Sequence, residues 1–334
     1  MSLIAELTAA THKYYSPVVI DQIFQYSPLL YRIFKIAKEG SWGLAQTTSG
    51  GRKIAETLEY QETAQASGSH GGYASSDTWV ADDEDSLTQA EYSWKMYHAT
   101  VKIPNITVSE NSAKARIFDI AAIRLKNASK TLRKDLATDL YADETGESGT
   151  TMMGLRALVK ATGTIGGIDK GSYSWWQGVI STAESNRTLT WAILNDLFMD
   201  TKHYGDGVAL SLFVCSDGVM QNYEDTYTKV VGADTSTSGV RLALQSGKVL
   251  EGGFRSFMFK GIPIVSDPFC PANKLFGLTE QFLHARILKQ FGTLGWKSIE
   301  DQGKDYLQAT FKGYLAFTCS CARKQSMAEA LTEA

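Results

Sequence analysis

The side chains that could do chemistry are few in this 334-residue chain, and they lie far apart along it. The five histidines fall on different predicted elements: His12, His70, His98, His203 and His284. No Gly-x-Ser-x-Gly elbow and no His-Glu-x-x-His helix occurs, so the usual patterns of a serine hydrolase and a zinc protease are absent. His70 and the carboxylates of 82–85 could form a hydrolytic or metal cluster, but a solvated loop is the simpler interpretation. We therefore expect no catalytic, cofactor-binding or metal-binding residues.

Glycine and cysteine patterns also favour structural roles. The stretch 162–167 is rich in glycine, but no strand-turn-helix unit surrounds it, which favours a flexible linker. Gly247-Lys248 is followed by Val249, where a phosphate-binding loop needs Ser or Thr. Cys319-x-Cys321 has no second Cys or His pair nearby in sequence, so we expect buried structural thiols and no metal site.

Composition excludes several classes of protein. Hydrophobic residues make up 43% and charged residues 21%, which is typical of a soluble folded protein. The net charge of −3 does not favour a nucleic-acid groove or a membrane surface. No apolar run reaches the roughly 18 residues of a membrane helix, and no signal peptide is apparent at the N-terminus. Four scattered cysteines suit a reducing cytoplasm.

One long helix is predicted from Ser109 to Ala142. Its apolar residues repeat at steps of three and four: Ile117, Ala121, Leu125, Ala128, Leu132, Leu136 and Leu140. Ser109 is the expected N-cap, with Glu110 in the first turn. The predicted helix is ~50 Å long and needs a broad surface to lie on. Its other flank is basic: Lys114, Arg116, Arg124, Lys126, Lys130, Arg133 and Lys134.

A long β-hairpin is predicted before this helix. Arg52–Gln61 and Glu91–Ile103 alternate with the period of two that marks strands with one wet face. In this pattern Tyr92 lies on the apolar face and Lys95 on the wet face. About thirty residues rich in Gly, Ser and Asp separate the strands, which is long for a compact domain. Because a two-stranded arm is marginal in water, we expect a partner to support it.

The flanking regions complete the predicted order of elements. Ser16-Pro17 and Ser27-Pro28 each predict the start of a short amphipathic helix. Residues 170–300 mix helices and strands, with Thr190 and Ser216-Asp217 as helix caps and an apolar strand over 209–215. A long strand is expected from Asp305 to Cys321, followed by a short helix from Ser326.

This order of elements, together with several local stretches, resembles the major capsid proteins of tailed bacteriophages, which have the Hong Kong 97-type fold. The stretches that carry the resemblance are 16–30, Gly146–Gly154, the 166–176 segment with Trp175-Trp176, and 259–271 with its Gly-Ile-Pro strand and Asp-Pro turn. The resemblance implies an α+β fold with an N-terminal arm, an extended E-loop, a spine helix, a peripheral domain and an axial domain. The expected divisions are 1–45 for the arm, 46–105 for the E-loop hairpin, 106–165 and 300–334 for the peripheral domain with its spine helix, and 166–299 for the axial domain.

The resemblance also implies a function. It predicts a shell protein of the virion capsid that assembles in the host cytoplasm into pentamers and hexamers, without catalytic activity or cofactors. The shell encloses double-stranded DNA without sequence-specific binding, and a separate scaffolding protein, a portal and a decoration protein are the implied partners. If the hairpin lies over an adjacent subunit, its charged residues are candidates for inter-subunit ion pairs: Arg52, Glu59, Asp82, Asp83, Glu84, Asp85 and Lys95.

Two alternatives stay open at this point. An encapsulin-type compartment shares the fold and holds cargo enzymes. A two-domain enzyme or sugar-binding protein, with 62–90 as a lid, requires a pocket with convergent polar groups.

Overall fold

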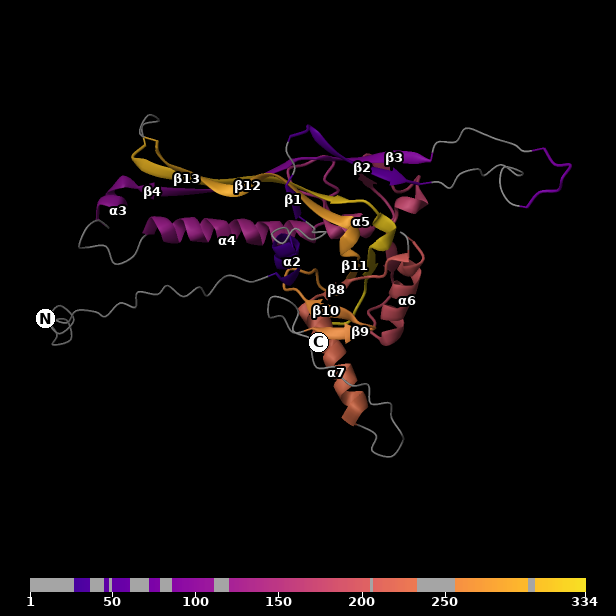
Figure 1. Ribbon diagram of the computed structural model, residues 1–334. Coiled ribbons are helices and arrows are strands. Elements are labelled where there is room, and N and C mark those ends of the chain that lie inside the picture. Colours follow the sequence, from indigo (N-terminus) through magenta and orange to yellow (C-terminus); the bar gives the residue numbers. More distant parts are fainter. Residues whose placement is uncertain are drawn as a thin grey trace. The chain divides into compact units, whose positions relative to one another are not determined.

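The computed structural model describes residues 27–36, 45–47, 50–60, 72–78, 86–110, 120–204, 207–232, 256–299 and 304–334. The chain divides into two compact units. The smaller holds Met1–Gln25, His98–Lys134 and Phe291–Lys312, and the larger holds Tyr26–Tyr97, Asp135–Gln290 and Gly313–Ala334. Figure 1 shows helices and strands mixed along the chain, so the α+β class predicted from the sequence is confirmed.

A six-stranded sheet lies in the larger unit. Parallel pairs join β8 to β10 and β7 to β14, and the other pairs are antiparallel. All four residues of β8 are buried, which explains why its sequence is an unbroken apolar run. The strands, in spatial order, are β7 (Val179–Ser181), β14 (Ser326–Ala328), β11 (Leu275–Leu278), β8 (Leu212–Cys215), β10 (Ile262–Ser266) and β9 (Phe257–Phe259).

Two helices complete the core around this sheet. α6 (Trp191–Lys202) and α7 (Asp217–Gly232) contribute Leu194, Leu197 and Val219 to the same buried cluster as the strands. Thr190 is the N-cap residue of α6, as predicted, although its side chain makes no capping hydrogen bond. The Ser216 hydroxyl, expected to cap α7, donates instead to Glu333 at 2.5 Å.

The predicted hairpin is present. β2 (Lys53–Glu59) pairs antiparallel with β3 (Leu87–Ser93) over seven residue pairs, from Lys53↔Ser93 to Glu59↔Leu87. Ile54 and Leu58 of β2 are buried on one face, as the alternation predicted.

The alternation reverses at Trp94, which separates β3 from β4 (Lys95–Pro104). Tyr92 is buried, as expected from a strand of period two. After the break, Lys95 and Tyr97 are buried and Met96 is exposed. The prediction of one continuous strand, with Lys95 on the wet face, was therefore wrong, because one residue outside the ladder moves every following side chain to the opposite face.

A four-stranded sheet contains the longest strands. Its order is β1 (Ala45–Thr47), β12 (Leu283–Ser298), β13 (Tyr306–Cys319) and β4. β1 pairs parallel with β12 from Ala45↔Ala285 to Thr47↔Ile287. The long late strand predicted over 305–321 is confirmed as β13, whereas β12 was not predicted.

The long helix is shorter than predicted in the part that the structure describes. α4 runs from Ile120 to Leu140, and Figure 1 shows it as one continuous helix. Residues 111–119 lie outside the described residues. Ser109 belongs to a separate helix, α3 (Asn105–Glu110), and its hydroxyl donates to the Asn105 carbonyl at 3.0 Å. Its prediction as the N-cap of the long helix was therefore wrong.

The arm contributes one described helix. α2 (Pro28–Ile36) begins directly after Ser27, whose hydroxyl accepts a hydrogen bond from the Leu30 backbone N–H at 3.2 Å. This is the predicted arrangement of a serine cap with proline at the first helical position. The helix predicted after Ser16-Pro17 lies outside the described residues.

The end of the chain differs from the prediction. Residues 326–328 form strand β14, not a short helix, and pair with β11 on one side and β7 on the other. Backbone hydrogen bonds to both neighbours outweigh the weak local helical preference of this stretch.

Gly166 and Gly167, with φ of 63° and 77°, form the turn between β5 (Thr164–Ile165) and β6 (Ile168–Asp169), as a type I′ hairpin requires.

Candidate assembly interface

The β2–β3 hairpin is the first candidate for an assembly contact. Its base is held by contacts with the rest of the larger unit. The Tyr92 hydroxyl donates to the Cys319 carbonyl at 2.8 Å and accepts from the Cys319 N–H at 3.3 Å. Burial raises the pKa of Tyr92 well above its ordinary value, so the phenol stays protonated and keeps both bonds. Strand β3 is thereby tied to the end of β13.

A charged contact fixes the other strand of the hairpin. Glu56 of β2 accepts hydrogen bonds from Arg286 Nη2 at 2.8 Å and from the Thr318 hydroxyl at 3.0 Å. The side chains of Glu56 and Arg286 are only 12% and 19% exposed, so this pair is less screened than a surface pair. Burial lowers the pKa of the neighbouring His284, which favours its neutral form beside Arg286.

A close backbone approach adds a third anchor. The Glu91 N–H donates to the Gly166 carbonyl at 2.9 Å, and a Cβ at Gly166 would lie 2.7 Å from the Cβ of Ala90. Beyond the base, the Tyr60 ring stacks on Trp175 with centroids 5.6 Å apart. The base of the hairpin is therefore rigidly positioned, and its 61–71 and 79–85 stretches lie outside the described residues.

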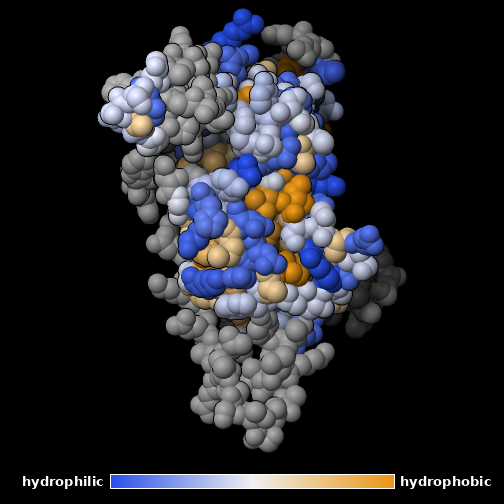
Figure 2. Space-filling model, turned by 90° about the vertical axis from the view of Figure 1, so that its right-hand side faces the viewer, coloured by the Kyte–Doolittle hydropathy of each residue, from blue (hydrophilic) through white to orange (hydrophobic). Residues whose placement is uncertain are grey.

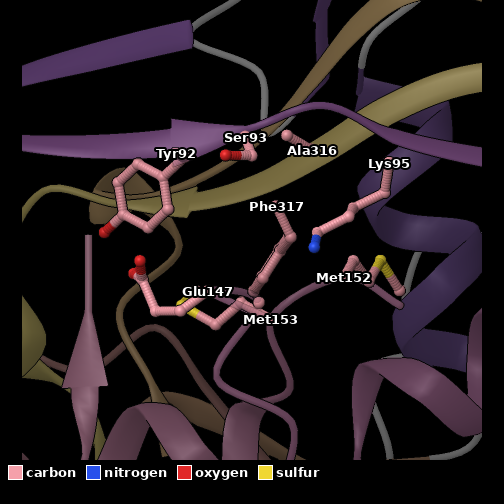
Figure 3. Close-up of a pocket in the computed structure, with 9 residues that line it drawn as sticks. Tyr92, Ser93, Lys95, Glu147, Met152, Met153, Ala316 and Phe317 are labelled. Carbon is pink, nitrogen blue, oxygen red and sulfur yellow. The ribbon is translucent and has the colours of Figure 1, made fainter. Parts of the chain in front are cut away.

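A small pocket lies beside this base, lined by side chains from β3, β4, β13 and the 146–153 loop (Figure 3). The Lys95 ammonium and the Glu147 carboxylate lie on opposite sides of the Phe317 ring in this view. The pocket volume of about 10 Å³ has room for about one water molecule. It is therefore too small for a sugar or a cofactor.

The predicted interface residues have different surroundings in the structure. Arg52 directly precedes β2 and Glu59 is its last residue, and both are exposed. Asp82, Asp83, Glu84 and Asp85 lie outside the described residues. Lys95 is only 7% exposed, and its Nζ donates to the Gly149 carbonyl at 2.7 Å within the same chain. Its ammonium is thus already bound inside the subunit, and its assignment to an inter-subunit ion pair stays untested.

Sequence reasoning missed the residues that anchor the hairpin. Glu56 and Arg286 are 230 positions apart, and neither carries a local pattern that predicts its partner. The sequence indicates the Tyr92 contact only weakly. A tyrosine on the apolar face of a strand needs a hydrogen-bond partner for its hydroxyl.

Exposed apolar side chains mark the surface near the hairpin and on α6. Leu87 is 64% and Met96 is 71% exposed, which is unusual for large apolar residues in strands. Trp191 and Met199 are exposed on α6. Figure 2 shows hydrophobic atoms gathered between hydrophilic ones on the face that lies to the right in Figure 1. Such patches are typical of surfaces that bind other proteins.

In the described part of the chain, the potential metal ligands are scattered and three of the four cysteines are buried. Within it, no group of three or more His, Cys, Asp or Glu side chains could hold a metal ion. Burial raises the pKa of Cys215, Cys270 and Cys319, so these thiols are protonated and unreactive. None of the helices that the structure describes is both long and apolar enough to span a membrane.

Solved structures with the same architecture include capsid proteins of bacteriophages. The chain superimposes on the capsid asymmetric unit of cyanophage A-1(L) with a TM-score of 0.72 and 16% identity, covering 98% of each chain. This chain has the Hong Kong 97-type capsid fold.

Other structures with the Hong Kong 97-type fold match the chain nearly end to end. The capsid of a native GTA particle matches with a TM-score of 0.63 at 11% identity, over 99% of this chain and 98% of the other. The holo-SrpI encapsulin complex from Synechococcus elongatus PCC 7942 matches with a TM-score of 0.60 at 9% identity, over 99% and 96%. No protein-family model matches the chain, and no curated protein does.

Proposed function

We propose that this chain is the major capsid protein of a tailed bacteriophage, and that it assembles into an icosahedral shell of pentamers and hexamers around double-stranded DNA. The observation that carries the proposal is the match of nearly the whole chain, arm to C-terminus, to capsid subunits. The proposed divisions are arm 1–45, E-loop hairpin 46–105, peripheral domain 106–165 with 300–334, and axial domain 166–299. The proposed location is the virion capsid, with assembly in the host cytoplasm.

The anchored hairpin base supports an inter-subunit role for the hairpin. Three contacts fix β2 and β3 within the larger unit, so the 61–85 stretch between them starts and ends at a fixed place on the subunit. We assign Arg52, Glu59 and the 82–85 carboxylates to contacts with a neighbouring subunit. Exposed ion pairs contribute about 0–1 kcal/mol each, so these pairs set the register of neighbours more than the strength of the shell.

The test removes the hairpin tip and leaves its base. Replacing 63–85 by a short Asn-Gly turn keeps the ladder from Lys53↔Ser93 to Glu59↔Leu87. We expect a folded subunit, with an unchanged melting temperature, that forms no closed particles by negative-stain microscopy or light scattering. Normal shells from this variant would overturn the inter-subunit role of the hairpin. A wild-type chain that stays monomeric with and without a co-expressed scaffolding protein would overturn the capsid proposal itself.

The encapsulin-type compartment is the second candidate, favoured by the match to an encapsulin complex. The content of native particles distinguishes the two candidates, because a capsid contains DNA and a compartment contains a cargo enzyme. The proposed scaffolding, portal and decoration partners apply only to the capsid. An enzyme or sugar-binding protein has less support, because the solved structures that match the chain are capsids and an encapsulin complex.

A further inference from the structure

Two basic side chains lie beside one carboxylate at the base of the hairpin. His284 and Arg286 are two residues apart on β12 and alternate with buried residues, so their side chains lie on the same face of the strand. Arg286 donates from Nε and Nη2 to Glu56 of β2, at 3.2 and 2.8 Å. His284 therefore lies on the face of β12 that carries the contact with the hairpin.

The charges in this site balance only while His284 is neutral. The one carboxylate of Glu56 is matched by the guanidinium of Arg286. A further hydrogen bond to Glu56 comes from the neutral hydroxyl of Thr318, whose oxygen also lies 3.4 Å from the His284 carbonyl oxygen. β1 pairs with β12 beside these residues, and its residues 45–47 are an alanine, a glutamine and a threonine, which do not titrate.

The two buried titratable groups near Glu56 add no second negative charge. Burial raises the pKa of Tyr92 and of Cys319, so the phenol and the thiol stay neutral. A protonated His284 would therefore place two cations beside one carboxylate in a partly buried site, where a surplus charge is costly. Burial is the main cause that lowers the pKa of His284; Glu56 acts in the opposite direction, and Arg286 lowers it further.

We propose that His284 is a pH switch that controls the attachment of the hairpin: protonation of its imidazole weakens the contact between β12 and β2. The closed site disfavours the imidazolium, whereas an opened hairpin lets water hydrate it. Opening therefore takes up a proton, and it becomes easier as the pH falls below about 6.5, the ordinary pKa of histidine. The switch concerns the single subunit, and its effect on shells rests on the proposed function.

The test follows the opening of β2 in the full chain by hydrogen exchange. Protection factors of the amides across 53–59 are measured from about pH 7.5 to about pH 5, where most carboxylates are still ionised. A protection factor is a ratio to the intrinsic exchange rate, so the pH dependence of the exchange chemistry itself cancels. In wild type, protection should be constant above about pH 7. Below about pH 6.5 it should fall by up to about tenfold per pH unit, which is the limit for one proton.

Two variants of single histidines give the comparison. His284→Gln keeps a neutral polar side chain that does not titrate, so its protection across 53–59 should not depend on pH. His98→Gln removes an exposed histidine of β4 and should keep the pH dependence of wild type. Equal pH dependence in wild type and His284→Gln, or constant protection in wild type, would overturn the proposal.

An independent measurement titrates the histidines directly. In NMR spectra of carbon-13-labelled histidine side chains, the signal that is missing from His284→Gln belongs to His284 and should titrate below about pH 6.5. If this variant does not fold, His284→Asn identifies the signal instead. A His284 signal that titrates at or above this pH would overturn the proposal, whatever the exchange data show.

Shell formation is scored separately, by negative-stain microscopy at about pH 7.5. Acidification to about pH 5.5 should lower the melting temperature of wild-type shells more than that of His284→Gln shells. Shells without this difference, and with protection across 53–59 independent of pH, reject the switch and leave the capsid function. If wild type forms no shells, the capsid function is rejected, and the exchange and NMR results alone decide whether the switch exists.

Discussion

The Ser27 hydroxyl donates a 2.5 Å hydrogen bond to the carboxylate of Asp267, which lies 240 positions further along the chain. The same Asp267 oxygen accepts from the Tyr141 hydroxyl at 3.0 Å, and the other oxygen accepts from the Phe269 N–H at 2.9 Å. Burial raises the pKa of Asp267, while these hydrogen bonds act in the opposite direction. One buried carboxylate thus joins the residue before α2, the end of α4 and the end of β10.

Ser27→Ala should destabilise the subunit by about 2 kcal/mol, because it removes both a helix cap and a hydrogen bond to a buried carboxylate. Urea unfolding at neutral pH measures the loss. Ser172→Ala is the control, since it removes an exposed hydrogen bond of 2.7 Å to Asp169, and should cost less than about 1 kcal/mol. Equal losses in the two variants would contradict the special role of the buried contact.

Glu56→Gln should destabilise the hairpin base by about 3 kcal/mol, because it leaves the Arg286 guanidinium largely buried without its counter-charge. Glu59→Gln, at the exposed end of the same strand, should change stability by less than about 0.5 kcal/mol. Thermal unfolding of both variants gives the comparison. Hydrogen exchange across 53–59 should rise in the first variant alone. An unchanged exchange rate there would show that the ion pair does not hold β2.

Gly154→Ala should destabilise the subunit by about 3 kcal/mol or more, because a Cβ at this position would lie 1.9 Å from the Ala142 carbonyl oxygen. Backbone on both sides would have to move. Gly207→Ala is the control: its φ is +71°, but no atom lies within 4 Å of the added Cβ, so only backbone strain of about 1–2 kcal/mol is expected. The ranking of the two melting temperatures is the measurement, and the reverse ranking would refute the steric argument.

Lys170 should make stability depend on pH on the alkaline side. Its buried Nζ donates to the Ala157 and Lys160 carbonyls, each at 3.1 Å, and burial lowers its pKa to about 8. The folded pKa is below the ordinary value of 10.5, so the unfolded chain binds one more proton between these pH values. The contribution of this lysine to the free energy of unfolding therefore rises from about pH 8 to 10.5, by up to about 3 kcal/mol.

The measurement for Lys170 compares wild type with a variant. The comparison removes the effect of the buried thiols, which lower the free energy of unfolding as the pH rises through the same range. The free energy of unfolding of wild type minus that of Lys170→Met should increase with pH above 8. Parallel pH curves for wild type and Lys170→Met would contradict the lowered pKa.

The helices and strands that are determined by residues close together in the sequence could be predicted. The period of two over β2 and β3, the period near 3.6 over α4 and the Ser27-Pro28 start of α2 are all local signals, and all three elements are present. The apolar run of β8 was predicted for the same reason.

Elements fixed by distant residues could not be predicted. β12 contains Gly292 and Gly295, which interrupt its alternation, and it becomes a strand by pairing with β1 and β13. β14 spans three residues, too short for any period to be visible. The burial of Lys95 follows from the break at Trp94, and nothing in the sequence of either strand indicates that break.

The position of β14 has a consequence for the order in which the chain folds. β7 and β11 are synthesised long before residues 326–328. They are joined into one sheet only when this strand pairs between them. A nascent chain that stops before residue 326 therefore has its central sheet split, with β7 separated from the other four strands. Because growing chains add roughly 5–20 residues per second, a ribosome needs several seconds to pass from β11 to β14. During that interval the six-stranded sheet is incomplete, so the finished surface of the larger unit forms only after residues 326–328 have been made.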